Sequence, residues 1–241
     1  MLKILSCFLL LMSMFCNVYA EDLSDAEKIM AIAQMSGMSV QEVENELYKL
    51  EEDLELTYTE LIHLAYSEYV LTAQNNNSGS GRAITLTGKK ALSEANYGSM
   101  FGDYFYTPAE SDVILDVDWN HGHAGIYNTT VSIVHAPGPD KTVCIALASD
   151  VSVYNGSKFA RYKNSSTSIS NTAVNFAMSQ IGLPYHKNFI NKGCNIGKFN
   201  CSQLVYCSYL QAGIILDNGS NIFVSPIDLV NDSDSYVYAT Y

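Results

Sequence analysis

The chain has 241 residues, with 25 acidic against 13 basic side chains and a formal net charge of −12 at pH 7. Such a chain lacks the excess of lysine and arginine that neutralises phosphates, which excludes the usual mode of nucleic-acid binding. Nearly half of the residues are hydrophobic, which is enough to build a core in a folded domain.

Residues 1–20 have the pattern of a secretory signal peptide. Lys3 precedes a run rich in Leu, Phe and Met, and Val18-Tyr19-Ala20 places small residues at the two positions that signal peptidase requires. The apolar run is short for a membrane helix, and no other stretch is long enough to cross a bilayer. We therefore expect a mature chain without a stable membrane span, secreted or held in the cell envelope, extracellular or periplasmic.

The next segment, residues 21–75, is predicted to be an acidic helical module. Within it, residues 21–68 hold 13 of the 25 carboxylates. Two capping boxes, beginning at Ser24 and Ser39, mark helix starts. Val43, Leu47, Leu50 and Leu54 then recur at spacings of four and three, and the stripe continues with Leu61, Leu64 and Ala65 beyond a predicted break at residues 56–59. The narrow stripe predicts shallow packing on the rest of the chain, and a propeptide, a docking arm or a wall-targeting element are the alternatives.

Residues 76–81, rich in Asn, Ser and Gly, are predicted to form a linker, and residues 82–241 a compact mixed domain. Short β-rich stretches predict strands at 103–107, 124–127, 130–135, 142–148 and 151–154, and apolar periodicity predicts helices at 170–181 and 201–212. The expected fold class is therefore α+β, with a small antiparallel sheet packed against the last helix and an α-helical module in front.

Four cysteines remain after signal cleavage: Cys144, Cys194, Cys201 and Cys207. They are too few and too unevenly spaced for a disulfide scaffold. Cys194 has Cys144 or Cys207 as a possible partner, but buried free thiols are the preferred interpretation of the latter two. Cys201 opens a predicted helix, where free backbone N–H groups and the helix dipole favour a thiolate, so it is the candidate nucleophile.

Three histidines complete the candidate site. His123 lies twelve residues before His135, across a predicted hairpin, so that His135 is placed to hold the ring of His123 while His123 takes the thiol proton. His121, two residues before His123, raises the rival interpretation of a zinc site formed by all three. A surface histidine is the simpler interpretation of His121, and no metal or other cofactor is expected.

Together these segments resemble a known family. The motifs Gly102-Asp103, His123-Ala124-Gly125-Ile126-Tyr127 and Val134-His135-Ala136 resemble the histidine half of the NlpC-type papain-like cysteine peptidases, which cut bacterial cell-wall peptides. Gly182-Leu183-Pro184-Tyr185 and Asn200-Cys201-Ser202-Gln203 resemble the cysteine half. Because the histidine half comes first, the chain is similar to the circularly permuted, YiiX-like branch.

The resemblance covers about residues 98–230 and implies a papain-like fold. It implies that Cys201 is the nucleophile, His123 the base and His135 the third polar residue, with Tyr185 lining the site. Asn200 and Gln203 stand where the peptidases have Asp and Gly in the motif Asp-Cys-Ser-Gly, which bears on the binding of a free peptide amine.

The expected function is that of a secreted cysteine hydrolase that cleaves amide bonds through a Cys-His-His triad, in peptidoglycan-derived peptides, as an amidase or endopeptidase. Two alternatives stay open. One is a hydrolase or acyltransferase of the same fold acting on lipid or small-molecule amides and esters. The other is a non-enzymatic binding or toxin-like module in which the acidic helices engage a partner.

Overall fold

The computed structural model describes residues 23–36, 38–54, 56–76, 86–96, 98–108, 112–114, 117–119, 122–187, 189–220 and 222–241. The predicted signal peptide, almost all of the predicted linker and His121 lie outside these residues.

The described helices are α2 (Asp25–Ser36), α3 (Val40–Leu54), α4 (Tyr58–Asn76), α5 (Leu92–Ala95), α6 (Thr167–Ser179), α7 (Cys201–Leu210) and α8 (Pro226–Asn231). The described strands are β1 (Lys90–Ala91), β2 (Tyr104–Thr107), β3 (Asp112–Ile114), β4 (Val117–Trp119), β5 (His123–Tyr127), β6 (Ser132–His135), β7 (Cys144–Leu147), β8 (Ser152–Val153), β9 (Lys158–Tyr162) and β10 (Ser235–Thr240). None of the helices in the described part of the chain combines the length and the apolarity that a membrane crossing requires.

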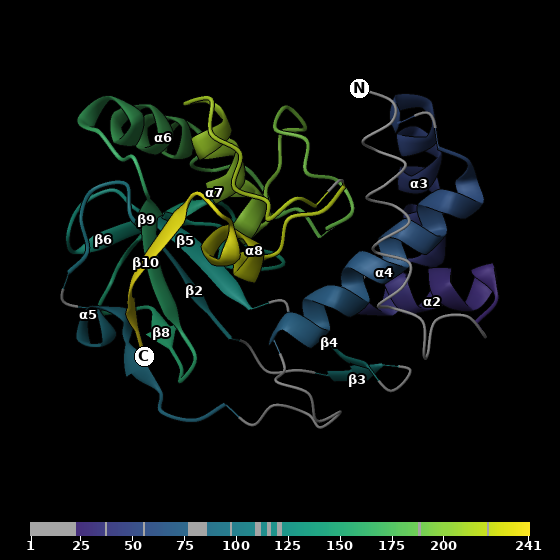
Figure 1. Cartoon of the computed structure of the whole chain (residues 1–241), viewed down its shortest axis with the longest axis horizontal. Coiled ribbons are helices and arrows are strands. Elements are labelled where there is room, and N and C mark those ends of the chain that lie inside the picture. Colours follow the sequence, from purple (N-terminus) through teal and green to yellow (C-terminus); the bar gives the residue numbers. More distant parts are fainter. Residues whose placement is uncertain are drawn as a thin grey trace.

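An antiparallel sheet of six strands forms the centre of the molecule, in the order β10-β9-β2-β5-β6-β7. Helices α6, α7 and α8 cover one face of this sheet, with α6 and α7 side by side (Figure 1). Strand β2 is buried along its whole length because it lies between two strands and under these helices. The predicted α+β class, with an antiparallel sheet packed against the helix that begins at Cys201, is confirmed.

Apolar side chains from both layers make the main core. From the sheet, this core takes Tyr104, Ala124, Ile126 and Val134. From α6 and α7, it takes Ala173, Val174, Leu204 and Val205. Residues such as Tyr104 and Tyr106 alternate with Phe105, which belongs to a second core on the other sheet face, so the period-two pattern places the strand between two apolar layers. The start of α7 is thereby fixed against β5.

The helices α2, α3 and α4 form the predicted acidic module, on the opposite side of the molecule from strand β6 (Figure 1). Apolar side chains of all three helices are buried, among them Ile32, Leu47 and Leu61 at 0 % exposure, while Leu50 and Leu64 are partly buried. Four side chains of the cysteine-bearing part close the same core: Phe189, Ile190, Ile222 and Phe223. The packing is therefore deeper than the narrow stripe predicts.

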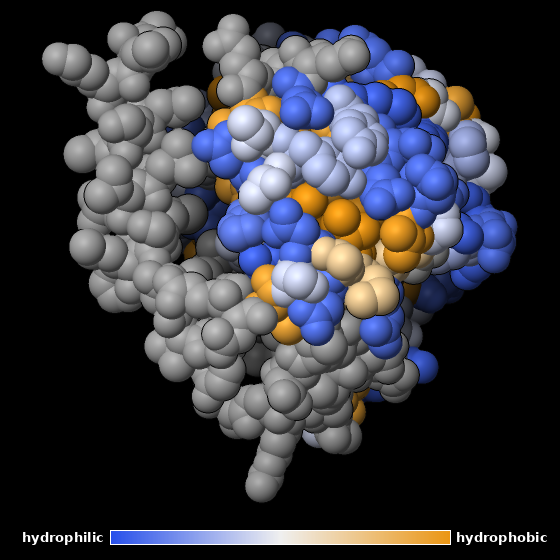
Figure 2. Space-filling model, turned by 90° about the vertical axis from the view of Figure 1, so that its right-hand side faces the viewer, coloured by the Kyte–Doolittle hydropathy of each residue, from blue (hydrophilic) through white to orange (hydrophobic). Residues whose placement is uncertain are grey.

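The face that carries these helices is mainly hydrophilic, with a smaller apolar area at its centre (Figure 2). Glutamates that begin the helices take part in capping rather than in binding a neighbour. Glu27 and Glu42 each accept hydrogen bonds from a serine at the helix start, which lowers the pKa of both carboxyls. Part of the acidity of the module thus serves the helix starts, as the two predicted capping boxes require.

Candidate active site

Cys201 is the first residue of α7 and is almost completely buried, at 1 % exposure. Its thiol lies within hydrogen-bonding reach of the backbone N–H groups of Ala124, in β5, and of Ser202. The pairing of β5 with β6 covers only Ile126 with Val134 and Tyr127 with Ile133, so the beginning of β5 is open to the helix. The cysteine and the strand that begins with His123 are therefore in direct contact.

A capping box built from Asn200 and Gln203 fixes the helix start. The Asn200 side chain accepts a hydrogen bond from the backbone N–H of Gln203 at 2.8 Å, and the Gln203 side chain accepts one from the backbone N–H of Asn200 at 3.3 Å. The Gln203 amide also donates to the carbonyls of Asn191 and Gly193. Both side chains are buried, at 1 % and 0 % exposure.

The capping box gives Asn200 and Gln203 a structural role, and the substrate-binding role that the resemblance implies for them stays a prediction. Their side chains are turned into hydrogen bonds within the protein because two backbone donors of the helix start need acceptors. These hydrogen bonds fix the backbone on both sides of Cys201, which lies between the two residues in the chain.

The two histidines of the predicted triad meet directly. His123 Nε2 lies 2.9 Å from His135 Nδ1, within hydrogen-bonding distance. Gly125 makes this approach possible, because a Cβ at that position would lie 3.1 Å from the Cβ of His135 and 3.0 Å from the ring of Phe105. A larger residue at position 125 would push Phe105 or His135 by a few tenths of an ångström, so the close packing of His123 and His135 favours glycine in the His-Ala-Gly motif.

Burial shifts the pKa values of His135 and Cys201. It lowers the pKa of His135 to about 4, with Lys141 acting in the same direction, so His135 is neutral at pH 7. Burial also raises the pKa of Cys201 to about 11, although the nearby backbone N–H groups act in the opposite direction. The resting cysteine is therefore a neutral thiol, whereas its position at a helix start alone predicts a thiolate.

Tyr185 and His186 lie in the segment that pairs with the residues just before Cys201. Tyr185 forms a parallel bridge with Phe199, and the His186 backbone N–H donates to the Phe199 carbonyl at 3.0 Å. His186 is 1 % exposed, and its Nδ1 lies 3.0 Å from Gln203 Oε1. The sequence indicates Tyr185 through the resemblance but gives no signal for His186, because burial of a polar residue in a loop leaves no periodic pattern.

A disulfide joins Cys194 to Cys207, whereas Cys144 and Cys201 are free. The preferred interpretation of Cys207 as a free buried thiol is therefore wrong, and that of Cys144 as a free one is confirmed. Cys144 is half-buried rather than buried, because β7 is an edge strand. The bridge ties the loop that carries Asn191 and Gly193 to α7, close to the capping box.

Within the described ranges, no group of three or more His, Cys, Asp or Glu side chains is placed to hold a metal ion. His121, the third member of the rival zinc site, lies outside those ranges, so that hypothesis stays untested.

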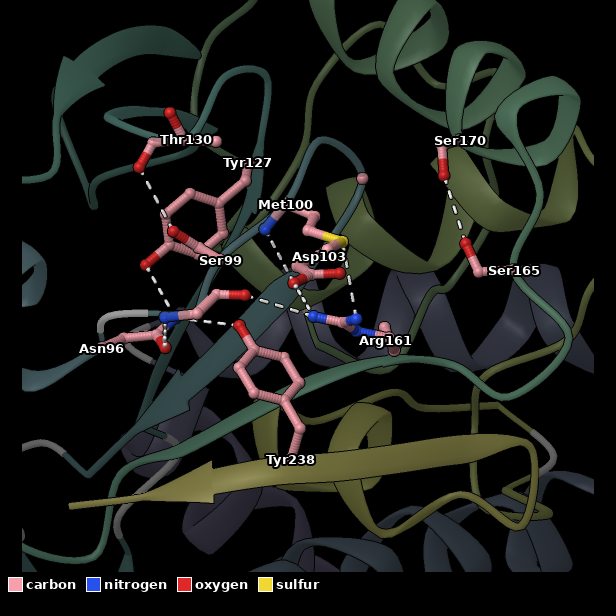
Figure 3. A network of polar contacts seen from close by, with 12 residues as sticks. Asn96, Ser99, Met100, Asp103, Tyr127, Thr130, Arg161, Ser165, Ser170 and Tyr238 are labelled. Atoms are coloured by element: carbon pink, nitrogen blue, oxygen red, sulfur yellow. Dashed lines mark hydrogen bonds and ion pairs between the residues drawn. The ribbon is translucent and has the colours of Figure 1, made fainter.

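A second polar cluster joins the start of β2 to its neighbour β9 and to the edge strand β10 (Figure 3). Arg161 donates to Asp103 at 2.9 Å and lies over the ring of Tyr238, 4.4 Å from its centroid. Asn96 donates to the Tyr238 hydroxyl at 2.9 Å. These contacts hold the sheet edge together and involve none of the candidate catalytic residues.

A cysteine at a helix start, against two neighbouring antiparallel strands that each carry one histidine of a contacting pair, defines a papain-like cysteine hydrolase in which the histidine half precedes the cysteine half. The model of one family, the permuted papain-like amidase enzymes (YaeF/YiiX, C92 family), matches residues 104–232, more than half of the chain. The chain belongs to this family of cysteine peptidases and amidases.

Two individual proteins are also similar. The uncharacterized protein YycO of Bacillus subtilis (strain 168) is 33 % identical over 119 residues, which are 48 % of this chain and 47 % of that protein. The chain thus spans about half the length of this relative. The crystal structure of metalloprotein yiiX from Escherichia coli O157:H7 is 16 % identical, with a TM-score of 0.43 over 59 % of this chain and 97 % of that one.

Proposed function

We propose that the protein is a secreted amidase or endopeptidase that cleaves peptide bonds of the cell wall with Cys201, His123 and His135. Membership of a permuted papain-like amidase family supports amide-bond hydrolysis. The single observation that supports the triad is the 2.9 Å contact between His123 Nε2 and His135 Nδ1, because His123 lies on the strand whose Ala124 N–H reaches the Cys201 thiol.

The protonation states of Cys201 and His135 indicate how the first step, attack on the carbonyl carbon, takes place. Because Cys201 rests as a thiol, His123 Nδ1 removes its proton as the sulfur attacks the carbonyl carbon. A base that accepts at Nδ1 carries its own hydrogen on Nε2, so His135 Nδ1 accepts that hydrogen bond. A neutral His135 suits this role, since burial lowers the pKa of His135 to about 4.

The later steps are those of acyl transfer to the cysteine and then to water. Backbone N–H groups near the start of α7 stabilise the oxyanion, and His123 returns its proton to the leaving amine as the C–N bond breaks. Water then attacks the thioester while His123 accepts its proton, which releases the acid and restores the thiol.

The substrate is proposed from location and family. The signal-like residues 1–20 direct the protein to the compartment where peptidoglycan lies, and an amide-cleaving enzyme meets stem peptides there.

The test is to incubate the mature protein with purified peptidoglycan and identify the products by mass spectrometry. We expect new amino groups from the unaltered protein and from Cys144→Ala, the matched free cysteine, and none from Cys201→Ala. Products from Cys201→Ala would contradict the proposed nucleophile. Release of fatty acid from lipid esters, with peptidoglycan left intact, would contradict the proposed substrate.

A further inference from the structure

A cavity of about 390 Å³ lies between helix α3 and the segment that leads to Cys201. Glu42, Glu46 and Lys49 line it from the helix, and His186, Lys187 and Lys198 line it from the segment. The loop before α7 reaches towards the helical module in this region (Figure 1). None of the residues proposed for catalysis lines this cavity.

His186, one of the residues that line this cavity, has an acceptor atom that no described residue uses. The Gln203 amide nitrogen donates to two carbonyls, so Gln203 Oε1 is the atom that faces His186, and His186 Nδ1 must donate to it. The neutral ring then carries a lone pair on Nε2. This atom is buried and has no hydrogen-bond partner among the described residues. A buried acceptor left in this state is destabilising unless a donor reaches it.

The charges around the cavity favour an anion. Two carboxylates face three ammonium groups there, in a chain whose net charge is −12. Glu46 already accepts hydrogen bonds from Lys49 and Asn191, and Glu42 accepts two from Ser39. Lys187 and Lys198 form no salt bridge with any residue that the structure describes. Both lysines help to lower the pKa of Glu42, but neither is held in a salt bridge by a described residue, so they are the groups placed to bind a ligand's charge.

We propose that this cavity binds a carboxylate that has an N–H group beside it, as in an N-acylated amino acid or the last residue of a peptide. Lys187 and Lys198 bind the carboxylate, and the N–H donates to His186 Nε2. The cavity volume suits one or two residues of such a ligand. The proposal does not require Cys201 to be a nucleophile.

The site is coupled to the nucleophile helix through hydrogen bonds. His186 Nδ1 contacts Gln203, and Gln203 accepts from the backbone N–H of Asn200, directly before Cys201. A ligand on Nε2 strengthens the donor character of Nδ1 and thus this chain of bonds. Occupancy of the cavity and the position of the helix start are therefore linked.

Binding is measured by isothermal titration calorimetry on full-length mature Cys201→Ala, which cannot turn over a ligand. Three probes separate the two contacts. N-Acetylglycine has both groups, its methyl ester lacks the charge, and N-acetylsarcosine lacks the N–H. We expect N-acetylglycine to bind about tenfold more tightly than either of the others. The methyl ester loses the contact with the lysines, and N-acetylsarcosine loses the contact with His186 Nε2.

Variants locate the binding. Lys198→Met should weaken the binding of N-acetylglycine about tenfold. Lys89→Met, which replaces an exposed lysine elsewhere, should leave this affinity unchanged. His186→Asn keeps a donor for Gln203 and removes Nε2, so it should reduce the affinity for N-acetylglycine to that for N-acetylsarcosine and leave the latter as it was. Should this variant fail to fold, the methylated probe on the unaltered cavity measures the same contact.

Three results would overturn the proposal. These are the absence of N-acetylglycine binding, equal affinity for the three probes, and binding that survives Lys198→Met and folded His186→Asn. None of them bears on hydrolysis by Cys201, which the peptidoglycan experiment tests separately.

Discussion

Burial is the strongest influence on the titratable side chains of this site. A cysteine at a helix start gains from the dipole and from free N–H groups, effects of about 0.3–2 kcal/mol. Removal of the thiolate from water opposes them, and the net result raises the pKa of Cys201 to about 11. The proposed chemistry therefore depends on a base that accepts the proton during attack, rather than on a preformed thiolate.

The two histidines are expected to contribute unequally to turnover. His123→Ala removes the base and should lower kcat/KM by about 10²–10⁴-fold. His135→Ala removes only the group that holds the base, so a larger remainder should persist, and His135→Asn should retain more than His135→Ala. Steady-state kinetics on one amide substrate measures all three. Equal and complete loss at both positions would contradict this division of roles.

Stability should fall as the pH decreases from about 6.5 to about 4, the interval between the usual pKa of histidine and the lowered pKa values of His135 and His186. In this interval the unfolded chain binds protons that the folded chain does not, so acid favours unfolding. Each buried histidine should contribute on the order of 2 kcal/mol to the fall, discounted for partial burial.

Thermal melting at several pH values measures this loss. His135→Asn should flatten the pH dependence, whereas His63→Asn, which replaces a histidine with 54 % side-chain exposure, should not. The same slope in all three proteins would show that other groups cause it.

Among the elements, the start of α7 has the greatest bearing on activity. Asn200→Ala removes the side chain that caps the helix and should lower the free energy of unfolding by about 1 kcal/mol. Turnover should fall too, because Cys201 follows directly. Ser166→Ala removes the corresponding cap of α6 and is the matched control, with a similar loss of stability and unchanged turnover. Equal effects of both variants on turnover would contradict a specific role of the α7 cap.

Elements with a local signal could be predicted from the sequence, and elements defined by distant partners could not. The strand ending at Tyr127 and the helix starting at Cys201 have clear patterns and lie where the sequence predicts them. β9 and β10 were not predicted, because they pair with each other across more than seventy residues and no hairpin turn joins them. Helix α6 begins at Thr167 rather than at the predicted Ser170, since its first turn is polar and only the Ser166 cap marks it.

In the candidate site, too, the features marked by local motifs could be predicted from the sequence, and those that depend on tertiary contacts could not. Motif spacing brings His123, His135 and Cys201 into one hypothesis, and the structure places the two imidazoles in contact with each other. The pairing of Cys194 with Cys207, the inward turn of Gln203 and the buried His186 depend on how the loop before α7 folds back on the helix. No local pattern encodes that fold.

At the scale of the whole molecule, the helical module shares a core with the cysteine-bearing part. Deleting residues 23–76 would expose Phe189, Ile190, Ile222 and Phe223, each worth about 1.5–3 kcal/mol when buried. We therefore expect the truncated protein to melt at a lower temperature than the full mature chain, or to aggregate. Thermal melting and kinetics of both proteins test this.

Phe223→Ala in the full chain is a milder control for the same contact and should lower the free energy of unfolding by about 3–5 kcal/mol. A truncated protein with unchanged melting temperature and unchanged turnover would instead support the separately folding domain that the sequence alone predicts.

The most direct test of the central claim is to locate the acyl group during turnover. The full mature protein is mixed with the p-nitrophenyl ester of N-acetylglycine, quenched in acid and mapped by peptide mass spectrometry. We predict a hydroxylamine-sensitive acetylglycyl group on the peptide that contains Cys201, and none on that peptide in Cys201→Ala. Turnover with the acyl group on Cys144, or with no acylated cysteine at all, would contradict the account.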